Sequence, residues 1–323
     1  MAIHSASSRS ASSRNTSART AKTALAAGAA VLLTLSLASC STDTADTTGN
    51  DAAGVSYAAD ENTLVFGVVP DSVDTQTNYQ PLMDYVEQET GKTVEYHEST
   101  DYAALIEAAI AGKIDVASFS GFTYITATNS GAAITPISSI VTTAGAAPGY
   151  YSQAIVPTDS AITSLTEFAG KKVCFVDPSS TSGYLFPSYN LLEAGVDPVA
   201  DVTPVFAGKH DVSVQKVGEG KECEVGFAED SEVAKSDQVK VIAETMVPGA
   251  PIVVSDTLPA ELKTRLAAVL GEVTIEDIIA SGVKSADTQA FRDTFYATEP
   301  VDDQYYDTIR DICVKTSAAQ CQG

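Results

Sequence analysis

The sequence predicts an α/β protein made of two consecutive units in which strands and helices alternate. Near-continuous apolar runs such as residues 63–70 (TLVFGVVP) are typical of strands buried on both faces of a parallel sheet. Amphipathic helical patterns follow such runs and end at glycine, as at Gly91 and Gly195. Because strand and helix alternate along the chain, we expect two doubly wound α/β lobes.

The first unit begins with the apolar strand and continues through two capped helices. Pro81 falls in the first turn of a helix, where its missing N–H is tolerated, and Asp101 is placed to cap the next one. The expected elements are strands at 63–70, 93–97, 114–119, 136–142 and 151–157, and helices at 78–91 and 100–112 and after the polar turn at 118–124.

The second unit repeats this alternation, and a helical region follows it. Residues 247–255 are an apolar run that we expect to form one strand returning to the first unit. The other expected elements are strands at 173–176, 202–206, 224–228 and 239–243, and helices near 165, up to 195, and at 210–218, 259–270, 275–280, 288–296 and 303–314. Two such units in series predict a cleft between them, because ligands of open α/β sheets lie beyond the carboxyl ends of the strands.

The first 39 residues have the pattern of an export signal. Four basic residues precede an apolar run at 24–38 that is too short for a comfortable membrane span. The run closes with LASC at 37–40, which resembles the lipobox of bacterial lipoproteins, so we expect cleavage before a lipid-carrying Cys40. A plain secretory signal with a coincidental cysteine is the alternative. Residues 40–62 are too polar to fold and predict a tether.

The charge of the chain excludes one class of partner. Its formal net charge of −23 argues against nucleic acid as a ligand, because phosphate backbones select basic surfaces. Local hydroxyl and N–H dipoles can still bind a small anion. The 44% hydrophobic content is sufficient for a sizeable core in 323 residues.

The cysteines predict two disulfides. Apart from Cys40, an exported chain with four thiols favours two bridges, and three pairings are possible. We expect Cys174 with Cys223, on two strands of one sheet, and Cys313 with Cys321, which are close in sequence. No Cys/His spacing typical of zinc occurs, and we expect neither a metal nor a cofactor.

The run at 173–189, VCFVDPSSTSGYLFPSY, is the strongest candidate for a binding segment. A strand is followed by the hydroxyls of Ser179, Ser180, Thr181 and Ser182 and then by a helical pattern. Hydroxyls beside the unpaired N–H groups of a helix start make a seat for an anion. Ordinary helix capping is the alternative. Ser120 lies in a second polar turn of this kind.

Four ordered segments resemble one family. DPSSTSGYLFP, FAGKHDVSV, TDYAALIEAAIAGKIDVA and GYYSQAIVP are similar to segments of the periplasmic phosphonate-binding proteins, the substrate-binding proteins of ABC transporters for phosphonate, phosphite or phosphate. The resemblance covers residues 64–258. It implies the type II periplasmic-binding-protein fold, in which two α/β lobes joined by a two-segment hinge close on the ligand.

The resemblance also implies the domain boundaries and the partners. Lobe 1 is expected at 63–152 with 250–323, and lobe 2 at 153–249. The protein would be a monomer, lipid-anchored at the extracytoplasmic face of the cell membrane, and would deliver its ligand to an ABC permease and its ATPase.

The family's anion contacts fall on hydroxyls, an imidazole and one acid. The resemblance implies that the ligand-binding residues are Tyr102, Tyr150, Ser180, Thr181, Ser182, His210 and Asp230. We add Ser120, because it lies in the second polar turn. Their neutral donors can satisfy the three oxygens of a phosphonate, and hydrogen bonds to a charged group contribute about 1.5–3 kcal/mol each. Taken singly, His210 or Asp230 could instead be a capping residue, and the tyrosines could be packing aromatics.

An acid beside an anion limits the choice of ligand. Asp230 could accept a hydrogen bond from a P–OH group or from a ligand ammonium. Family members that bind aminoalkyl phosphonates share a second acidic residue, and the resemblance places Ala250 at the corresponding position of this chain. We therefore predict a ligand without an amine: phosphite, phosphate or a short alkyl phosphonate.

Three other functions remain open from the sequence. An enzyme is disfavoured because neither a G-x-S-x-G elbow nor an H-E-x-x-H motif occurs. A ferric-ion binder of the same fold would explain the paired phenols Tyr150–Tyr151 and Tyr305–Tyr306. A binder of sulfonates or other oxyanions is the nearest alternative.

Overall fold

The computed structural model describes residues 61–322. The expected signal segment at 1–39, Cys40 and nearly all of the tether at 40–62 lie outside the described residues. The described residues belong to one compact unit. Among them, no helix combines the length and the hydropathy that crossing a bilayer requires.

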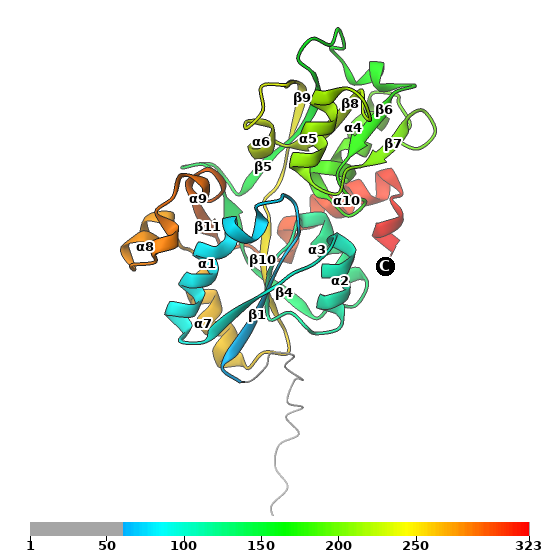
Figure 1. The fold of residues 1–323 in the computed structure, drawn as a ribbon. Coiled ribbons are helices and arrows are strands. Elements are labelled where there is room, and N and C mark those ends of the chain that lie inside the picture. Colours follow the sequence, from blue (N-terminus) through cyan, green and yellow to red (C-terminus); the bar gives the residue numbers. More distant parts are fainter. Residues whose placement is uncertain (1–60, 323) are drawn as a thin grey trace, which may run out of the picture. The chain divides into compact units, whose positions relative to one another are not determined.

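Eleven strands within the described residues form one mixed sheet (Figure 1). The path of neighbouring strands is β2-β1-β3-β10-β4-β5-β8-β6-β7, with β11 paired to β4 and β9 paired to β5. The strands are β1 Thr63–Val68, β2 Thr93–His97, β3 Val116–Ser118, β4 Ile134–Val141, β5 Gly149–Pro157, β6 Lys172–Phe175, β7 Thr203–Phe206, β8 Val225–Glu229, β9 Val239–Pro248, β10 Pro251–Ser255 and β11 Ala297–Glu299.

Two sets of three parallel strands repeat within this sheet. Strand β1 lies between β2 and β3, and β6 lies between β7 and β8, all in parallel pairing. An antiparallel strand flanks each set, since β10 pairs with β3 and β5 pairs with β8. The expected α/β alternation is therefore present, and these antiparallel strands make the sheet mixed.

The expected single strand at 247–255 is wrong in one respect. The chain is interrupted at Gly249, so Val247 and Pro248 end β9, and β10 begins at Pro251. A Cβ at Gly249 would lie 2.4 Å from the Ser139 hydroxyl oxygen, so glycine permits this close approach to β4. The Pro248–Gly249 pair was the available sequence signal of the interruption.

Ten α-helices within the described residues surround the sheet. They are α1 Thr75–Thr90, α2 Tyr102–Ile110, α3 Gly121–Asn129, α4 Phe186–Glu193, α5 His210–Glu219, α6 Asp230–Val233, α7 Ala260–Leu270, α8 Ile275–Ala280, α9 Gln289–Thr294 and α10 Asp307–Thr316. The helix expected near 165 is a short 3-10 turn, and a π-helical turn at Thr181–Leu185 precedes α4. The Asp101 carboxylate caps α2 as expected, accepting a 2.8 Å hydrogen bond from the N–H of Ala104.

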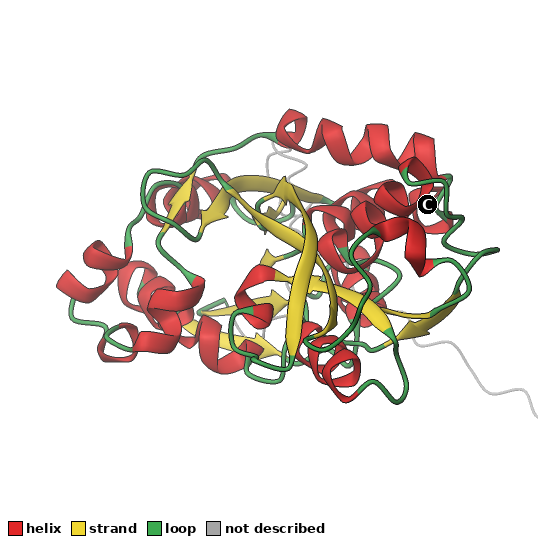
Figure 2. Ribbon diagram, turned by 90° about the horizontal axis from the view of Figure 1, so that it is seen from above, coloured by secondary structure: helices red, strands yellow, loops and turns green. Residues whose placement is uncertain are grey.

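Helices cover both faces of the strands (Figure 2). One core cluster joins the strand residue Ala117 to α2, α3 and α10, and a second joins Phe66 and Val68 to α1, α7 and α8. Around β6 and β8, one cluster involves α4 through Leu191 and another involves α5 through Val217. This burial on both faces explains why the strand sequences are apolar rather than alternating.

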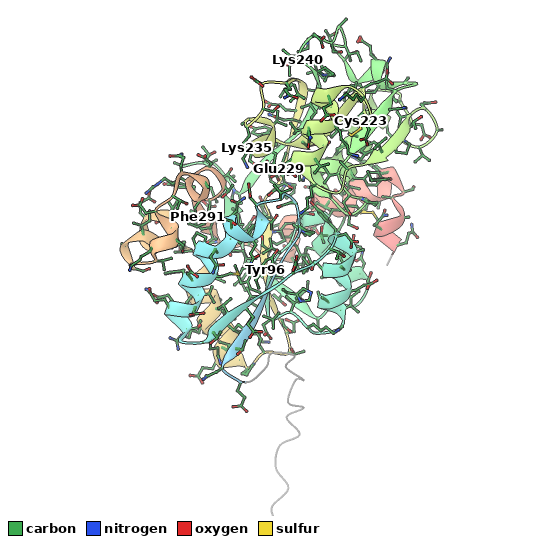
Figure 3. All side chains as sticks on the ribbon, in the orientation of Figure 1. Tyr96, Cys223, Glu229, Lys235, Lys240 and Phe291 are labelled. Carbon is green, nitrogen blue, oxygen red and sulfur yellow. A yellow bond between two sulfur atoms is a disulfide. The ribbon has the colours of Figure 1, made fainter. Side chains whose placement is uncertain are left out.

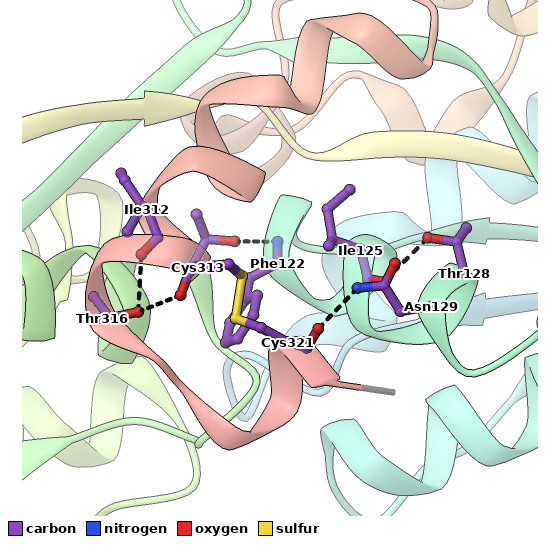
Figure 4. The surroundings of a disulfide bond; sticks show 9 residues. Phe122, Ile125, Thr128, Asn129, Ile312, Cys313, Thr316 and Cys321 are labelled. Atoms are coloured by element: carbon purple, nitrogen blue, oxygen red, sulfur yellow. Dashed lines mark hydrogen bonds between the residues drawn. A yellow bond between two sulfur atoms is a disulfide. The ribbon is translucent and has the colours of Figure 1, made fainter.

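Both disulfides pair as expected. Cys174 of β6 is bonded to Cys223, just before β8, and Cys313 of α10 is bonded to Cys321 (Figure 4). The Asn129 side-chain amide at the end of α3 donates a 3.2 Å hydrogen bond to the carbonyl of Cys321. The second bridge therefore holds the C-terminal turn beside α3.

Candidate ligand-binding site

A cavity of about 490 Å³ lies beyond the carboxyl ends of β1, β3 and β8. Asp71 follows β1, Ser120 follows β3, and Glu229 is the last residue of β8. Strand ends are the usual place for ligands in α/β sheets, because loops and helix starts converge there. The other polar or aromatic residues that matter for this site are Tyr79, Tyr102, Tyr150, His210, Asp230 and Glu232.

His210 is the first residue of α5 and is almost fully buried. Its backbone N–H donates a 2.7 Å hydrogen bond to the carbonyl of Asp71. Its imidazole Nδ1 accepts a 2.9 Å hydrogen bond from the backbone N–H of Glu229. A ring nitrogen that accepts carries no proton, so the neutral ring holds its proton on Nε2. The ring is therefore fixed as a donor at Nε2.

The protonation of His210 agrees with this geometry. Burial lowers the pKa of His210 to about 4, although the carboxylate of Asp71 opposes the shift. Nε2 lies 3.9 Å from Oε2 of Glu229, and this contact is not an ion pair while the ring is neutral. At neutral pH the imidazole supplies one uncharged N–H to the cavity.

Two acids that the sequence analysis did not select flank His210. Burial and repulsion from Glu229 raise the pKa of Asp71 to about 7, and burial raises the pKa of Glu229 to about 7 (Glu229 is labelled in Figure 3). Oδ1 of Asp71 accepts a 2.6 Å hydrogen bond from Thr75, and Oε1 of Glu229 accepts one of 2.9 Å from Ser231. The sequence signal that could have identified both acids as site residues is their position after or at the end of a predicted strand.

The cavity contains acids but no fixed cation. Among its described lining residues there is no Lys or Arg, whereas five are Asp or Glu. Lys235 is paired with Glu232 at 2.6 Å, and Lys209 donates to the carbonyl of Ser72 at 2.9 Å. An anion in this cavity would thus depend on neutral donors for its hydrogen bonds.

The cavity's phenols are such donors. Burial raises the pKa of Tyr79, Tyr102 and Tyr150, so these hydroxyls keep their protons at neutral pH. The Tyr79 hydroxyl lies 2.9 Å from that of Ser118, and the Tyr150 phenol interacts with the hydroxyl of Ser182. Tyr102 starts α2 and is buried, and no described residue forms a hydrogen bond with its hydroxyl at standard geometry.

Five of the eight expected ligand-binding residues meet at this cavity. Tyr102, Ser120, Tyr150, His210 and Asp230 all line it. The Asp230 carboxylate also accepts a 3.2 Å hydrogen bond from the N–H of Tyr151, which fixes its orientation. Ala250, at the position of the expected second acid, lines the same cavity.

The other three expected residues, Ser180, Thr181 and Ser182, do not line the cavity. The Ser180 hydroxyl accepts from the N–H of Gly183 at 3.0 Å, and that of Thr181 accepts from the N–H of Phe122 at 2.8 Å. The Ser182 hydroxyl is buried without a hydrogen bond of standard geometry to any described residue. In this structure Ser180 therefore acts as the cap of the turn, and Thr181 connects it to α3.

The second pair of phenols lies away from the cavity. The Tyr305 hydroxyl donates to the carbonyl of Pro148, and the Tyr306 hydroxyl donates to that of Gly249 at 3.3 Å. Neither residue lines the cavity that contains Tyr150. Within residues 61–322, no group of three His, Cys, Asp or Glu side chains is arranged to hold a metal ion.

This fold and cavity define the class of periplasmic solute-binding proteins. A family model described as the periplasmic substrate-binding protein of an ABC transporter for phosphonate matches residues 66–306. The chain therefore belongs to the family of phosphonate-binding periplasmic proteins of ABC transporters. This family consists of transport proteins that bind substrates, not of enzymes.

Individual proteins agree with this assignment. The phosphate-import protein PhnD of Mycolicibacterium smegmatis is 34% identical over 283 residues, which are 81% of this chain and 88% of that protein. A binding protein of an ABC phosphonate transporter from Pseudomonas aeruginosa superposes with a TM-score of 0.68 at 25% identity, covering 80% of this chain and 87% of that one. PhnD1 of Prochlorococcus marinus, solved with methylphosphonate, gives a TM-score of 0.67 at 17% identity, covering 80% and 99%.

Proposed function

We propose that this protein captures a phosphorus oxyanion, namely phosphite, phosphate or a short alkyl phosphonate, and delivers it to an ABC permease and its ATPase. The observation that carries this proposal is the orientation of His210, whose Nδ1 is occupied by the N–H of Glu229. The remaining Nε2–H is a neutral donor at the cavity. Neutral donors can bind an oxyanion without the cost of burying a mobile cation.

The donors around His210 suit a tetrahedral anion. The phenols of Tyr102 and Tyr150 and the hydroxyl of Ser120 line the same cavity. Four hydrogen bonds to a charged ligand, at about 1.5–3 kcal/mol each, can overcome the costs of association and give roughly micromolar affinity. The named relatives support this choice of ligand, because one is a phosphate-import protein and one was solved with methylphosphonate.

Capture would involve closure of two lobes. The proposed lobes are residues 63–152 with 250–323, and residues 153–249, and the two sets of parallel strands support this division. The hydrogen bond from Phe122 to Thr181 joins residues of the two proposed lobes. Ser180, Thr181 and Ser182 are proposed to contact the ligand after a rearrangement of this junction.

The remaining parts of the proposal concern the place of action. A lipid on Cys40 would hold a monomer at the extracytoplasmic face of the membrane, with residues 40–62 as the tether. The support is the lipobox-like LASC sequence that follows the apolar run at 24–38. Mass spectrometry of the protein from membranes tests this point, since a lipidated N-terminal Cys40 peptide is expected, and an uncleaved or unlipidated one would contradict it.

Calorimetric titration of the purified protein tests the ligand class. Phosphate, phosphite and methylphosphonate should be titrated beside methanesulfonate and ferric citrate, and native mass spectrometry should identify any ligand that copurifies. We expect at least one phosphorus oxyanion to bind with about micromolar Kd. Binding of only the sulfonate, or a coloured protein with bound iron, would support the alternative functions.

The predicted absence of a ligand amine needs its own comparison. Ala250 does not leave the cavity without acids, because Asp71 and Glu229 line it as well. The prediction of a ligand without an amine therefore requires that these acids contact the oxyanion group of the ligand and not an ammonium group. Tighter binding of 2-aminoethylphosphonate than of both methylphosphonate and phosphite would show that it is wrong.

A further inference from the structure

The Asp71 and Glu229 carboxyl groups interact electrostatically with each other, and both residues contact His210. Asp71 follows β1, in the first proposed lobe, and Glu229 ends β8, in the second. Both are tied to His210 through the backbone, since the His210 N–H donates to the Asp71 carbonyl and the Glu229 N–H donates to His210 Nδ1. The two acids therefore lie next to the donor that is proposed to hold the oxyanion.

Each carboxyl group has one oxygen held by the protein and one oxygen left for the cavity. Oδ1 of Asp71 accepts from Thr75, and Oε1 of Glu229 accepts from Ser231. Oδ2 of Asp71 and Oε2 of Glu229 have no hydrogen bond of standard geometry within residues 61–322, and Oε2 lies 3.9 Å from His210 Nε2. A ligand oxygen bound by Nε2 would thus lie within reach of both acids.

The surrounding charges do not neutralise this pair. Asp230 and Glu232 add negative charge, His210 is uncharged at neutral pH, and Lys235 is engaged by Glu232. The phenols of Tyr79, Tyr102 and Tyr150 remain protonated and can only donate to an anion. Above pH 7, where both carboxyl groups are mostly ionised, an oxyanion without a proton would meet two uncompensated acceptors here, which is unfavourable.

From this geometry, and resting on the proposed function, we infer that Asp71 and Glu229 form an acceptor pair that binds the proton of a P–OH group. The pocket therefore selects oxyanions that carry a proton, such as monoprotonated phosphate, phosphite or methylphosphonate. It rejects isosteric anions that are fully ionised, such as sulfate and methanesulfonate. Selection arises from the penalty on the wrong ligand as much as from the hydrogen bond to the correct one.

The position of the pair favours a P–OH group over a ligand ammonium. Glu229 Oε2 lies 3.9 Å from His210 Nε2, where the oxygens of the oxyanion are proposed to lie, and Asp71 interacts electrostatically with both residues. An amine on an alkyl substituent would lie farther from that nitrogen. The ammonium alternative remains a defined outcome of the experiment below.

Methylphosphonate and methanesulfonate make the sharpest comparison, because they have the same shape and differ in the proton. Titration calorimetry near pH 7.5 should give methylphosphonate an advantage of about 100-fold, because its single P–OH both avoids one unsatisfied acceptor and gains one hydrogen bond. Near pH 5.5 the pair holds protons and can donate, so the advantage should fall to about tenfold or less. Paired titrations in buffers of different ionisation enthalpy should show proton uptake on binding at the higher pH.

Two isosteric variants and one control complete the experiment. Asp71→Asn and Glu229→Gln each replace an acceptor by a donor, and each should bring methanesulfonate about tenfold closer to methylphosphonate near pH 7.5. Asp311→Asn removes an exposed charge from α10, outside the cavity, and should leave the ratio unchanged. If a variant does not fold, the pH series on the unaltered protein decides the question.

The outcomes separate this inference from the proposed function. If no phosphorus oxyanion binds at either pH, the proposed function is wrong and the inference falls with it. If methylphosphonate binds but neither pH nor the two substitutions change its advantage over methanesulfonate, only the inference is wrong. If 2-aminoethylphosphonate binds most tightly and the substitutions remove only that preference, the pair binds an ammonium instead.

Discussion

The backbone N–H of Glu229 donates a 2.9 Å hydrogen bond to Nδ1 of His210. Through this single contact the end of β8 sets the tautomer of an imidazole at the start of α5. The imidazole then presents an uncharged N–H to a cavity whose described lining contains no Lys or Arg. Recognition of an oxyanion here would depend on the direction of neutral donors. Salt screens such short hydrogen bonds much less than it screens attraction between distant charges.

The first prediction concerns the tautomer of His210. Burial lowers its pKa to about 4, so the ring should stay neutral, with its proton on Nε2, from about pH 8 down to about pH 5. NMR of nitrogen-labelled histidine measures this directly, and the His210 signals should not show the large change of ring protonation near the ordinary pKa of 6.5. Observation of a doubly protonated His210 at pH 6 would contradict the assignment.

The second prediction concerns stability and pH. The pKa of Asp71 is raised from 3.8 to about 7, so the folded state holds the proton more tightly than the unfolded state. Ionisation of Asp71 therefore removes stability as the pH rises from about 4 to about 7. Asp71→Asn should raise the free energy of unfolding by about 1–2 kcal/mol at pH 8 and leave it nearly unchanged at pH 4.

Thermal unfolding of both proteins at the two pH values checks this prediction. Asp293→Asn is the matched control, since Asp293 is exposed and accepts a hydrogen bond from Gln289. Equal melting temperatures of the Asp71 variant and the unaltered protein at pH 8 would mean that the ionised carboxylate is well solvated in the folded state.

The third prediction concerns the junction between the hydroxyl turn and α3. The Thr181 hydroxyl accepts from the N–H of Phe122, so Thr181→Val leaves a buried N–H without a partner at a cost of about 1–3 kcal/mol. Thr181→Ser keeps the hydroxyl and is the control. Titration calorimetry should show weakening of phosphorus-oxyanion binding by about tenfold for valine and much less for serine. Equal affinities for the two variants would show that the Thr181 hydroxyl does not contribute to oxyanion binding.

The fourth prediction compares the two disulfides. The Cys174–Cys223 bond closes a loop with a sequence separation of 49, and the Cys313–Cys321 bond closes one of 8. By the loop-entropy relation, removing the first with paired serines should cost about 4 kcal/mol, and removing the second about 2–3 kcal/mol. Denaturant titration measures both, and a larger loss for the C-terminal pair would indicate that packing of that turn outweighs chain entropy.

The sequence was sufficient to predict most of the fold because its signals are local. Buried parallel strands require continuous apolar runs, and caps such as Asp101 require a short acceptor before a helix. The interruption at Gly249 was missed because the apolar residues of 247–255 were given more weight than the Pro248–Gly249 pair, which favours a turn. What requires glycine there is the Ser139 hydroxyl on another strand, which no local pattern contains.

The candidate site was predicted less completely, for a related reason. Resemblance to a family selected His210, Tyr102, Tyr150 and Asp230, all of which line the cavity. Asp71 was missed because an acid after a strand is ordinarily a solvated turn residue. Glu229 was missed because the sequence does not show which of the adjacent acids Glu229 and Asp230 lies beside the imidazole. That is determined by the hydrogen bond between the end of β8 and His210.

A crystal structure of the protein with bound methylphosphonate tests the central claim most directly. We expect phosphorus in the cavity, with one ligand oxygen about 3 Å from Nε2 of His210 and with phenolic or seryl hydroxyls donating to the other oxygens. A ligand bound elsewhere, or held in this cavity by a lysine or arginine while Nε2 contacts only protein, would contradict it.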